Sequence, residues 1–288
     1  MSVLTAIAKG VGTAFRKPRI VAVLYVLNVL FTVAAAVPLL LIVQQELGPS
    51  LVGSNVRPMD AMWIGEAVLK YGEALMPLLG GVLVVGVLCL VLNIFLNGGV
   101  VGRLLDREGA SKLEPFFADS GRYFWRYVRI FLLSLVFWVL TFGLVLNLLS
   151  ALIRPLMENA WTEWLPLILS NLHLLIALLL LSIVRMIVDY ARIAVVSDGE
   201  RSVLRALRHA VRFLGARFFR AWAIYLLLVV LTLAGTIVFY VVFGRFAAPG
   251  VAGVVAGLVW TQLYVLFRLW MRTVFVAAQA EYYRAHPY

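Results

Sequence analysis

Six long apolar stretches constrain the fold of this chain more than any other feature of its sequence. They cover residues 20–43, 75–101, 130–152, 165–188, 223–243 and 251–270. A helix needs about 20 apolar residues to cross the hydrocarbon layer of a bilayer, and every stretch reaches that length. Long runs without polar alternation are typical of helices and not of barrel strands. We therefore predict an all-α polytopic membrane protein with six transmembrane helices.

The composition leaves no room for a separate soluble domain. Hydrophobic residues make up 64% of the chain and charged residues only 14%. A soluble domain has roughly one half and one quarter, respectively. The polar segments between the apolar stretches are short, so we predict a single integral membrane domain over residues 1–288.

The basic residues predict the orientation of the spans. Of the 25 Lys and Arg residues, four lie on the side opposite the N-terminus, which leaves 21 on the N-terminal side. The four are Arg57, Lys70, Arg154 and Arg245. Because cytoplasmic loops carry the excess of Lys and Arg, we expect both termini to be cytoplasmic.

Residues 197–222 form a basic segment that leads into the fifth apolar stretch. Four arginines recur there at helical spacing: Arg201, Arg205, Arg208 and Arg212. Apolar residues recur on another face, which predicts an amphipathic helix, and the Ser197 and Glu200 spacing predicts a capping box at its start. We expect this helix to lie in the headgroup layer with its arginines toward anionic phospholipid. The alternative is that the helix packs on its own protein and the arginines face water.

A pair of basic residues three apart precedes each odd-numbered span. The pairs are Arg16 and Arg19, Arg126 and Arg129, and Arg217 and Arg220. The repetition predicts three hairpins of two spans, each preceded by a cytoplasmic amphipathic helix. With the four arginines above, these residues are our candidates for contact with lipid headgroups. The alternative is that any cytoplasmic entry to a span gathers arginines and aromatic residues.

Polar side chains within the spans are the other candidates for a functional site, because they are costly in hydrocarbon. They are Arg185, Asp189, His173, Asn93, Asn97 and Arg268. Arg185 and Asp189 are four residues apart and can pair on one helix face. We expect Asp189, neutralised by Arg185 or by an arginine of the sixth span, to hold two spans together, with a gate or headgroup site as the alternative. The amides and His173 are expected to join helices or, if they converge, to line a polar cavity.

Motifs for enzymatic chemistry are missing from the sequence. It contains no GxxxxGK[ST], HExxH, GxSxG or CxxC, and Cys89 is its single cysteine. We therefore expect no enzyme activity, no catalytic residue, no cofactor and no metal site. The basic loops are short and lie next to spans, which favours anionic lipid over nucleic acid as the partner.

The C-terminal third resembles a group of bacterial membrane proteins. The residues that carry the resemblance are DYARIAVV at 189–196, SVLRALR at 202–208, VRF at 211–213, QLY at 262–264 and RLW at 268–270. They are similar to six-span proteins related to the membrane domain found beside some glycerophosphodiester phosphodiesterases. The resemblance implies a helical membrane domain with a lipid-related or accessory role. The soluble phosphodiesterase portion has no counterpart here, so it implies no catalytic residue.

Two functions follow as expectations from these patterns. The first is a non-enzymatic module of the bacterial inner membrane that interacts with lipid, or serves as an accessory subunit of a membrane complex, or both. Its partners would be anionic phospholipid and either another membrane protein or further copies of the chain. The alternative is a small-solute or lipid transporter built from repeated hairpins.

Overall fold

The computed structural model describes residues 1–47, 61–106, 113–162, 164–244 and 251–286, and of residues 38–47, 61–79 and 251 it describes the backbone alone. The elements, in chain order, are α1 (Val3–Arg16), α2 (Pro18–Leu47), α3 (Ala61–Leu105), α4 (Leu113–Val139), the π-helix η2 (Leu140–Leu146), α5 (Asn147–Glu158), α6 (Trp164–Ser197), α7 (Val203–Phe243) and α8 (Val251–Arg284). The part of the chain that the structure describes contains no strand.

The prediction of an all-α chain with six candidate spans is confirmed. Among the described residues, six helical stretches are long and apolar enough to cross a membrane: Pro18–Val37, Gly80–Leu105, Leu113–Glu158, Trp164–Ser197, Val203–Phe243 and Ala252–Arg284. The third consists of α4, η2 and α5 in one continuous helical run. Large apolar side chains such as those of Val139, Leu152 and Val254 lie exposed along these helices, as expected for surfaces that face lipid.

The chain forms two compact units, of which the larger consists of Met1–Val21 and Ile94–Tyr288. The smaller unit, Ala22–Asn93, holds most of α2 and the first part of α3. Within it, the amides of Asn28 and Asn93 donate to carbonyls one turn earlier on their own helices, those of Leu24 and Cys89. The candidate site residues lie in the larger unit, apart from Asn93, which lies in the smaller one.

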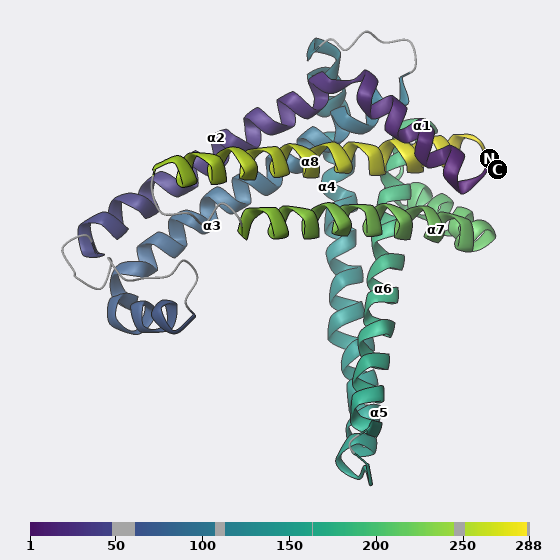
Figure 1. Cartoon of the computed structure of the whole chain (residues 1–288). Helices are drawn as coiled ribbons and strands as arrows, with labels where there is room; N and C mark the ends of the chain where they lie inside the picture. Colours follow the sequence, from purple (N-terminus) through teal and green to yellow (C-terminus); the bar gives the residue numbers. More distant parts are fainter. Residues whose placement is uncertain (48–60, 107–112, 163, 245–250, 287–288) are drawn as a thin grey trace. The chain divides into compact units, whose positions relative to one another are not determined.

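In the larger unit, the first helix packs on the last (Figure 1). Ser2 caps α1 by accepting a hydrogen bond from the Thr5 backbone N–H at 3.2 Å, and Pro18 separates α1 from α2 because it disfavours helical geometry at Lys17. Ala6, Gly10 and Ala14 form the buried stripe of α1. A Cβ atom on Gly10 would lie 2.7 Å from the backbone nitrogen of Ala278 on α8, so only glycine permits this approach.

The two chain ends meet beside this contact (Figure 1). The N-terminal amino group of Met1 lies 3.2 Å from Nε2 of His286. Whichever face of the membrane holds one terminus therefore holds the other.

An aromatic cluster joins the end of α6, the start of α7 and the end of α8. The rings of Tyr190 and Phe213 lie 5.0 Å apart, as do those of Phe213 and Tyr283. The Tyr283 hydroxyl donates to the Asp198 carboxylate at 2.7 Å. These contacts bury the apolar face of the first part of α7, at Val203, Ala206, Ala210, Phe213 and Leu214.

The structure corrects the predicted start of the basic helix. Ser197 is the last residue of α6 and not a cap for the next helix. The turn uses Gly199, whose φ of +66° lies in the left-handed region, and α7 begins at Val203 with the extended Ser202 before it. The basic segment and the fifth span also form one helical run, interrupted by the non-helical backbone of Arg217 (φ −139°, ψ 30°).

Candidate functional site

Three charged side chains of α6 form an ion-pair chain in the larger unit. Arg185 Nε lies 3.2 Å from Asp189 Oδ2, and Arg192 Nη1 lies 3.4 Å from Asp189 Oδ1. The Asp189 and Arg192 side chains are 15% and 17% exposed, whereas that of Arg185 is 52% exposed. The i,i+4 pair that the spacing predicts is therefore present, and Arg192 extends it by one turn.

A third arginine reaches this chain from α8. Arg272 Nη2 donates to the amide oxygen of Asn97 on α3 at 2.9 Å. The Asp189 carboxylate attracts the Arg272 guanidinium, and Arg185 and Arg192 repel it, so all four charges lie within electrostatic range. Arg272 of the sixth span lies within electrostatic range of Asp189, whereas Arg268 is exposed.

The backbone around this group is fixed by a buried tyrosine. The Tyr127 hydroxyl of α4 donates to the Arg192 carbonyl at 3.1 Å, and Tyr127 itself is 1% exposed. We call Arg185, Asp189, Arg192, Arg272 and Asn97 the arginine cluster. It draws on α3, α6 and α8, and the same carboxylate, that of Asp189, acts on all three guanidinium groups. The cluster thus carries a net charge of about +2, counting one unit for each ionised side chain.

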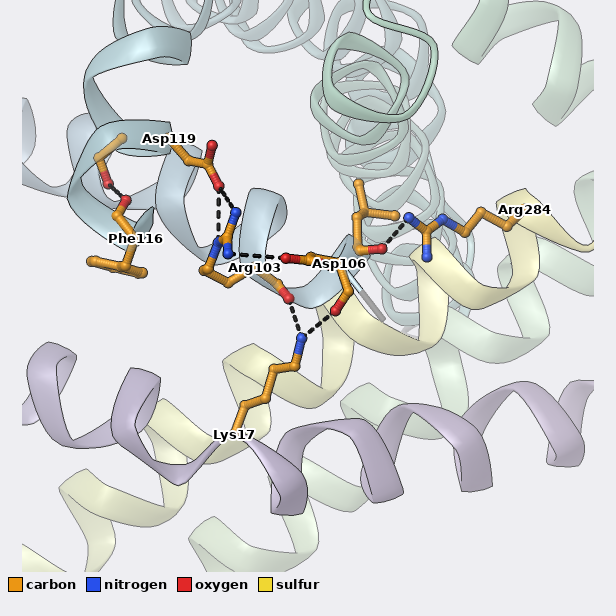
Figure 2. A network of polar contacts seen from close by, with 8 residues as sticks. Lys17, Arg103, Asp106, Phe116, Asp119 and Arg284 are labelled. Carbon is orange, nitrogen blue, oxygen red and sulfur yellow. Dashed lines mark hydrogen bonds and ion pairs between the residues drawn. The ribbon is translucent and has the colours of Figure 1, made fainter. Parts of the chain in front are cut away.

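A second polar network lies at the C-terminal end of α3 (Figure 2). Lys17 donates to the carbonyl oxygens of Arg103 and Asp106, and Arg284 donates to that of Leu105. The last carbonyls of a helix have no partner within the helix and carry its negative dipole end, so cations satisfy them well. Burial lowers the pKa of Lys17, while the Asp106 charge opposes that shift.

Acidic side chains complete this network. Arg103 Nη2 lies 2.7 Å from Asp119 Oδ2 on α4, and Arg103 Nη1 lies 3.0 Å from Asp106 Oδ2. Gly102 allows the approach, since a Cβ atom there would lie 2.6 Å from Asp119 Oδ2. Lys17, Arg103 and Arg284 are thus paired with backbone carbonyls or carboxylates. Their contacts link α1, α3, α4 and α8.

The predicted headgroup arginines lie mostly on exposed surfaces. The exposed ones are Arg16, Arg19, Arg129, Arg201, Arg205, Arg208, Arg212 and Arg220. Arg126 is partly covered and lies 5.6 Å from the ring centroid of Tyr123. Arg217, also partly covered, donates to the His286 carbonyl at 3.3 Å.

His173 lies apart from the arginine cluster, in a groove between α5 and α6. The groove has a volume of about 650 Å³, and its lining combines the apolar Ala151, Ile153 and Met157 with the polar Asn147, Ser150, Ser170, His173 and the ion-paired Arg154 and Glu158. Glu158 of α5 and His173 of α6 thus line the same groove, which spacing along one helix could not indicate. The groove follows η2, and π-helical turns are rare and often occur near functional sites.

Among the described residues, no group of three or more His, Cys, Asp or Glu could hold a metal ion. Comparison of the chain with protein-family models, curated proteins and solved structures finds no match. The resemblance of the C-terminal third therefore stays a prediction.

Proposed function

We propose that the protein is a non-enzymatic membrane module that binds anionic phospholipid and supports a partner complex. The observation that carries the proposal is the first part of α7. The side at Val203, Ala206, Ala210, Phe213 and Leu214 is buried within the protein, while Arg205, Arg208 and Arg212 are exposed on the opposite side and Arg201 is exposed just before the helix. A helix fixed in this way offers a preformed row of guanidinium groups, and each one near an anionic surface contributes about 1 kcal/mol.

The burial of these residues bears on both interpretations of the basic helix. It supports packing of the helix on its own protein, and it leaves the arginines free to face lipid headgroups. These buried side chains pack on the protein and are unavailable to insert into lipid, whereas Leu204 and Val211 of the same helix are exposed. The arginines, in turn, face outward at the same end of the larger unit as the chain termini, because α7 begins against the ends of α6 and α8. We place this end on the cytoplasmic side of a bacterial inner membrane, where positive charge accumulates. On this proposal the segments before the odd-numbered spans all lie at that surface.

The test compares lipid selectivity between two purified variants. We expect Arg205→Gln/Arg208→Gln/Arg212→Gln to lose most of the preference for phosphatidylglycerol over phosphatidylcholine, measured by native mass spectrometry in mixed micelles. Three charges at about 1 kcal/mol each predict a loss of up to about 100-fold. Arg154→Gln is the matched control, because Arg154 is equally exposed but lies at the other end of the helices. A triple variant with unchanged selectivity would refute the proposal.

Native mass spectrometry of protein extracted gently from its own membrane tests the accessory role. A stoichiometric protein partner would support it, whereas a chain that is always found alone would contradict it.

The groove beside His173 favours one alternative, a transporter for a small polar solute. Polar side chains are expensive to hold among apolar helices, so the part of the groove that they line is a reasonable place for a solute. Under this alternative, liposomes that contain the protein would take up the solute, and His173→Ala would abolish the uptake. Tight liposomes across a panel of amino acids, sugars and organic anions would count against it.

A further inference from the structure

The groove between α5 and α6 is lined by polar side chains in a definite order. From the end of α5 inward, the helix contributes Glu158, Arg154, Ser150 and Asn147. Side chains at spacings of three and four residues lie on one face of a helix, each about one turn from the next. Along the groove, a carboxylate is therefore followed by a guanidinium group, a hydroxyl and an amide.

This order leads from the edge of a candidate span into its apolar part. Glu158 is the last residue of α5, and Trp161 and Trp164 lie exposed just beyond it. Tryptophan is enriched where headgroups meet hydrocarbon. Asn147, at the start of α5, lies about 16 Å further along the helix than Glu158. The charged pair is therefore at the level of the headgroups, and the hydroxyl and amide lie deeper.

The opposite wall of the groove belongs to α6, which runs beside α5 (Figure 1). It supplies Ser170 and His173, which are three residues apart and share a helix face. In the described part of the chain, the His173 imidazole forms no hydrogen bond and no ion pair, so its ring nitrogens can serve a ligand. Leu167 and Leu174, three residues before and four after Ser170, are exposed. Apolar surface thus continues on this side of α6.

The charged pair can take up a ligand at little cost. Arg154 Nε lies 3.5 Å from Glu158 Oε1, and the two side chains are 81% and 69% exposed. An exposed ion pair of this kind contributes little to stability. A ligand with one positive and one negative group can therefore separate the pair and bind both partners. Because the two charges cancel, the pair favours a zwitterion over an anion.

We propose that this groove binds the headgroup of a phospholipid of the ethanolamine type. The ammonium group pairs with Glu158, and the phosphate pairs with Arg154, one turn deeper. Ser150, Asn147 and His173 donate to the ester oxygens of the glycerol. From water inward, the lipid presents ammonium, phosphate and esters, which is the order of their partners along α5. The groove volume of about 650 Å³ lies within the range of about 300–1,000 Å³ for small-ligand pockets.

This site differs from the row of arginines on α7 in place and in chemistry. The row lies at the end of α6 that holds Ser197, whereas the groove lies toward Trp164 at the other end. The proposal therefore does not rest on the row. Phosphatidylglycerol and phosphatidylcholine both carry the phosphate that Arg154 binds, so Arg154→Gln leaves the preference between those two lipids unchanged.

The experiment uses the full chain, delipidated in a neutral detergent, and counts bound lipid by native mass spectrometry. Phosphatidylethanolamine, phosphatidylcholine and phosphatidylglycerol are titrated separately. We expect one equivalent of phosphatidylethanolamine to bind about tenfold more tightly than phosphatidylcholine, whose trimethylated nitrogen has no N–H to donate to Glu158. Glu158→Gln should abolish this preference. Glu114→Gln is the matched control, because Glu114 is exposed at the far end of the same helical run, and it should keep the preference.

Reversal of the charge at the same position gives a positive signal. Glu158→Lys places a second cation beside Arg154, so we expect phosphatidylglycerol to become the preferred lipid. The 69% exposure of the Glu158 side chain makes both substitutions compatible with the fold. Equal affinities of the wild type for phosphatidylethanolamine and phosphatidylcholine would overturn the proposal, as would an unchanged preference in Glu158→Gln.

A soluble form of the headgroup separates this site from the solute-transport alternative. Glycerophosphoethanolamine carries the same charged groups without acyl chains, and we expect it to bind at least tenfold more weakly than the lipid, because it cannot use the apolar surface beside the groove. Binding as tight as that of the lipid would overturn the assignment to phospholipid and favour a solute site. The triple α7 variant should keep the preference for phosphatidylethanolamine, so the two lipid proposals can fail independently.

Discussion

Lys17 shows how much a single side chain contributes in this protein. It lies in the break between α1 and α2, yet it satisfies two carbonyls at the end of α3 (Figure 2). Arg284 satisfies a third from the far end of the sequence. Such contacts cannot be predicted from local spacing, because the partners are separated by 86 to 179 residues. The hydrogen bond between Arg272 and Asn97, which are 175 residues apart, cannot be predicted for the same reason.

Replacement of Lys17 by methionine should destabilise the larger unit. The variant keeps the length and apolar character of the side chain but leaves carbonyls of Arg103 and Asp106 without their donor. Loss of a hydrogen bond to a charged group costs about 1.5–3 kcal/mol. Thermal unfolding in detergent measures the change, with Lys9→Met on the exposed side of α1 as control. Equal melting temperatures for Lys17→Met and the wild type would show that the network adds no stability.

At the scale of elements, the sequence predicts the apolar centre of each helix but not its ends. The fourth span was predicted to end at residue 188, because Asp189 and Arg192 interrupt the apolar run. In the structure α6 continues to Ser197, with Tyr190, Ile193 and Val195 buried against the rest of the unit. The two charged residues are compatible with this burial because they pair with each other. Helix ends depend on such tertiary contacts, whereas the apolar centres follow from composition alone.

Because α1 packs closely on α8, we expect alanine to have opposite effects on stability at two nearby glycines. Gly10→Ala would push a Cβ atom against the Ala278 backbone, and overpacking of this kind costs about 1–3 kcal/mol. Gly12→Ala meets no atom within 4 Å, and alanine should stabilise the helix by up to about 1 kcal/mol. The two melting temperatures should therefore move in opposite directions in thermal unfolding. If both variants shift alike, the close packing of α1 on α8 is wrong.

At the scale of the whole molecule, charge asymmetry and the proximity of the termini bear on topology. The six candidate spans and the meeting of Met1 with His286 agree with an even number of membrane crossings. The proposed side rests on the distribution of Lys and Arg. The arrangement of three hairpins likewise stays a prediction.

Cysteine labelling tests this topology directly, because Cys89 is the single cysteine and can first be replaced by serine. In that background we expect Asn159→Cys to react with an impermeant maleimide added outside intact spheroplasts. Ser2→Cys and a cysteine appended to the C-terminus should react only after the membrane is permeabilised. Labelling of Asn159→Cys and Ser2→Cys from the same side would refute the proposed orientation.

The packing of the first helix on the last has a consequence for biosynthesis. A ribosome makes α1 before the other described helices, but its partner α8 follows all of them along the sequence. The buried stripe of α1 therefore stays uncovered until α8 has been made. Any chain that stops before α8 lacks the surface that covers this stripe. A cell could thus recognise an unfinished copy by its exposed N-terminal helix, and degrade it.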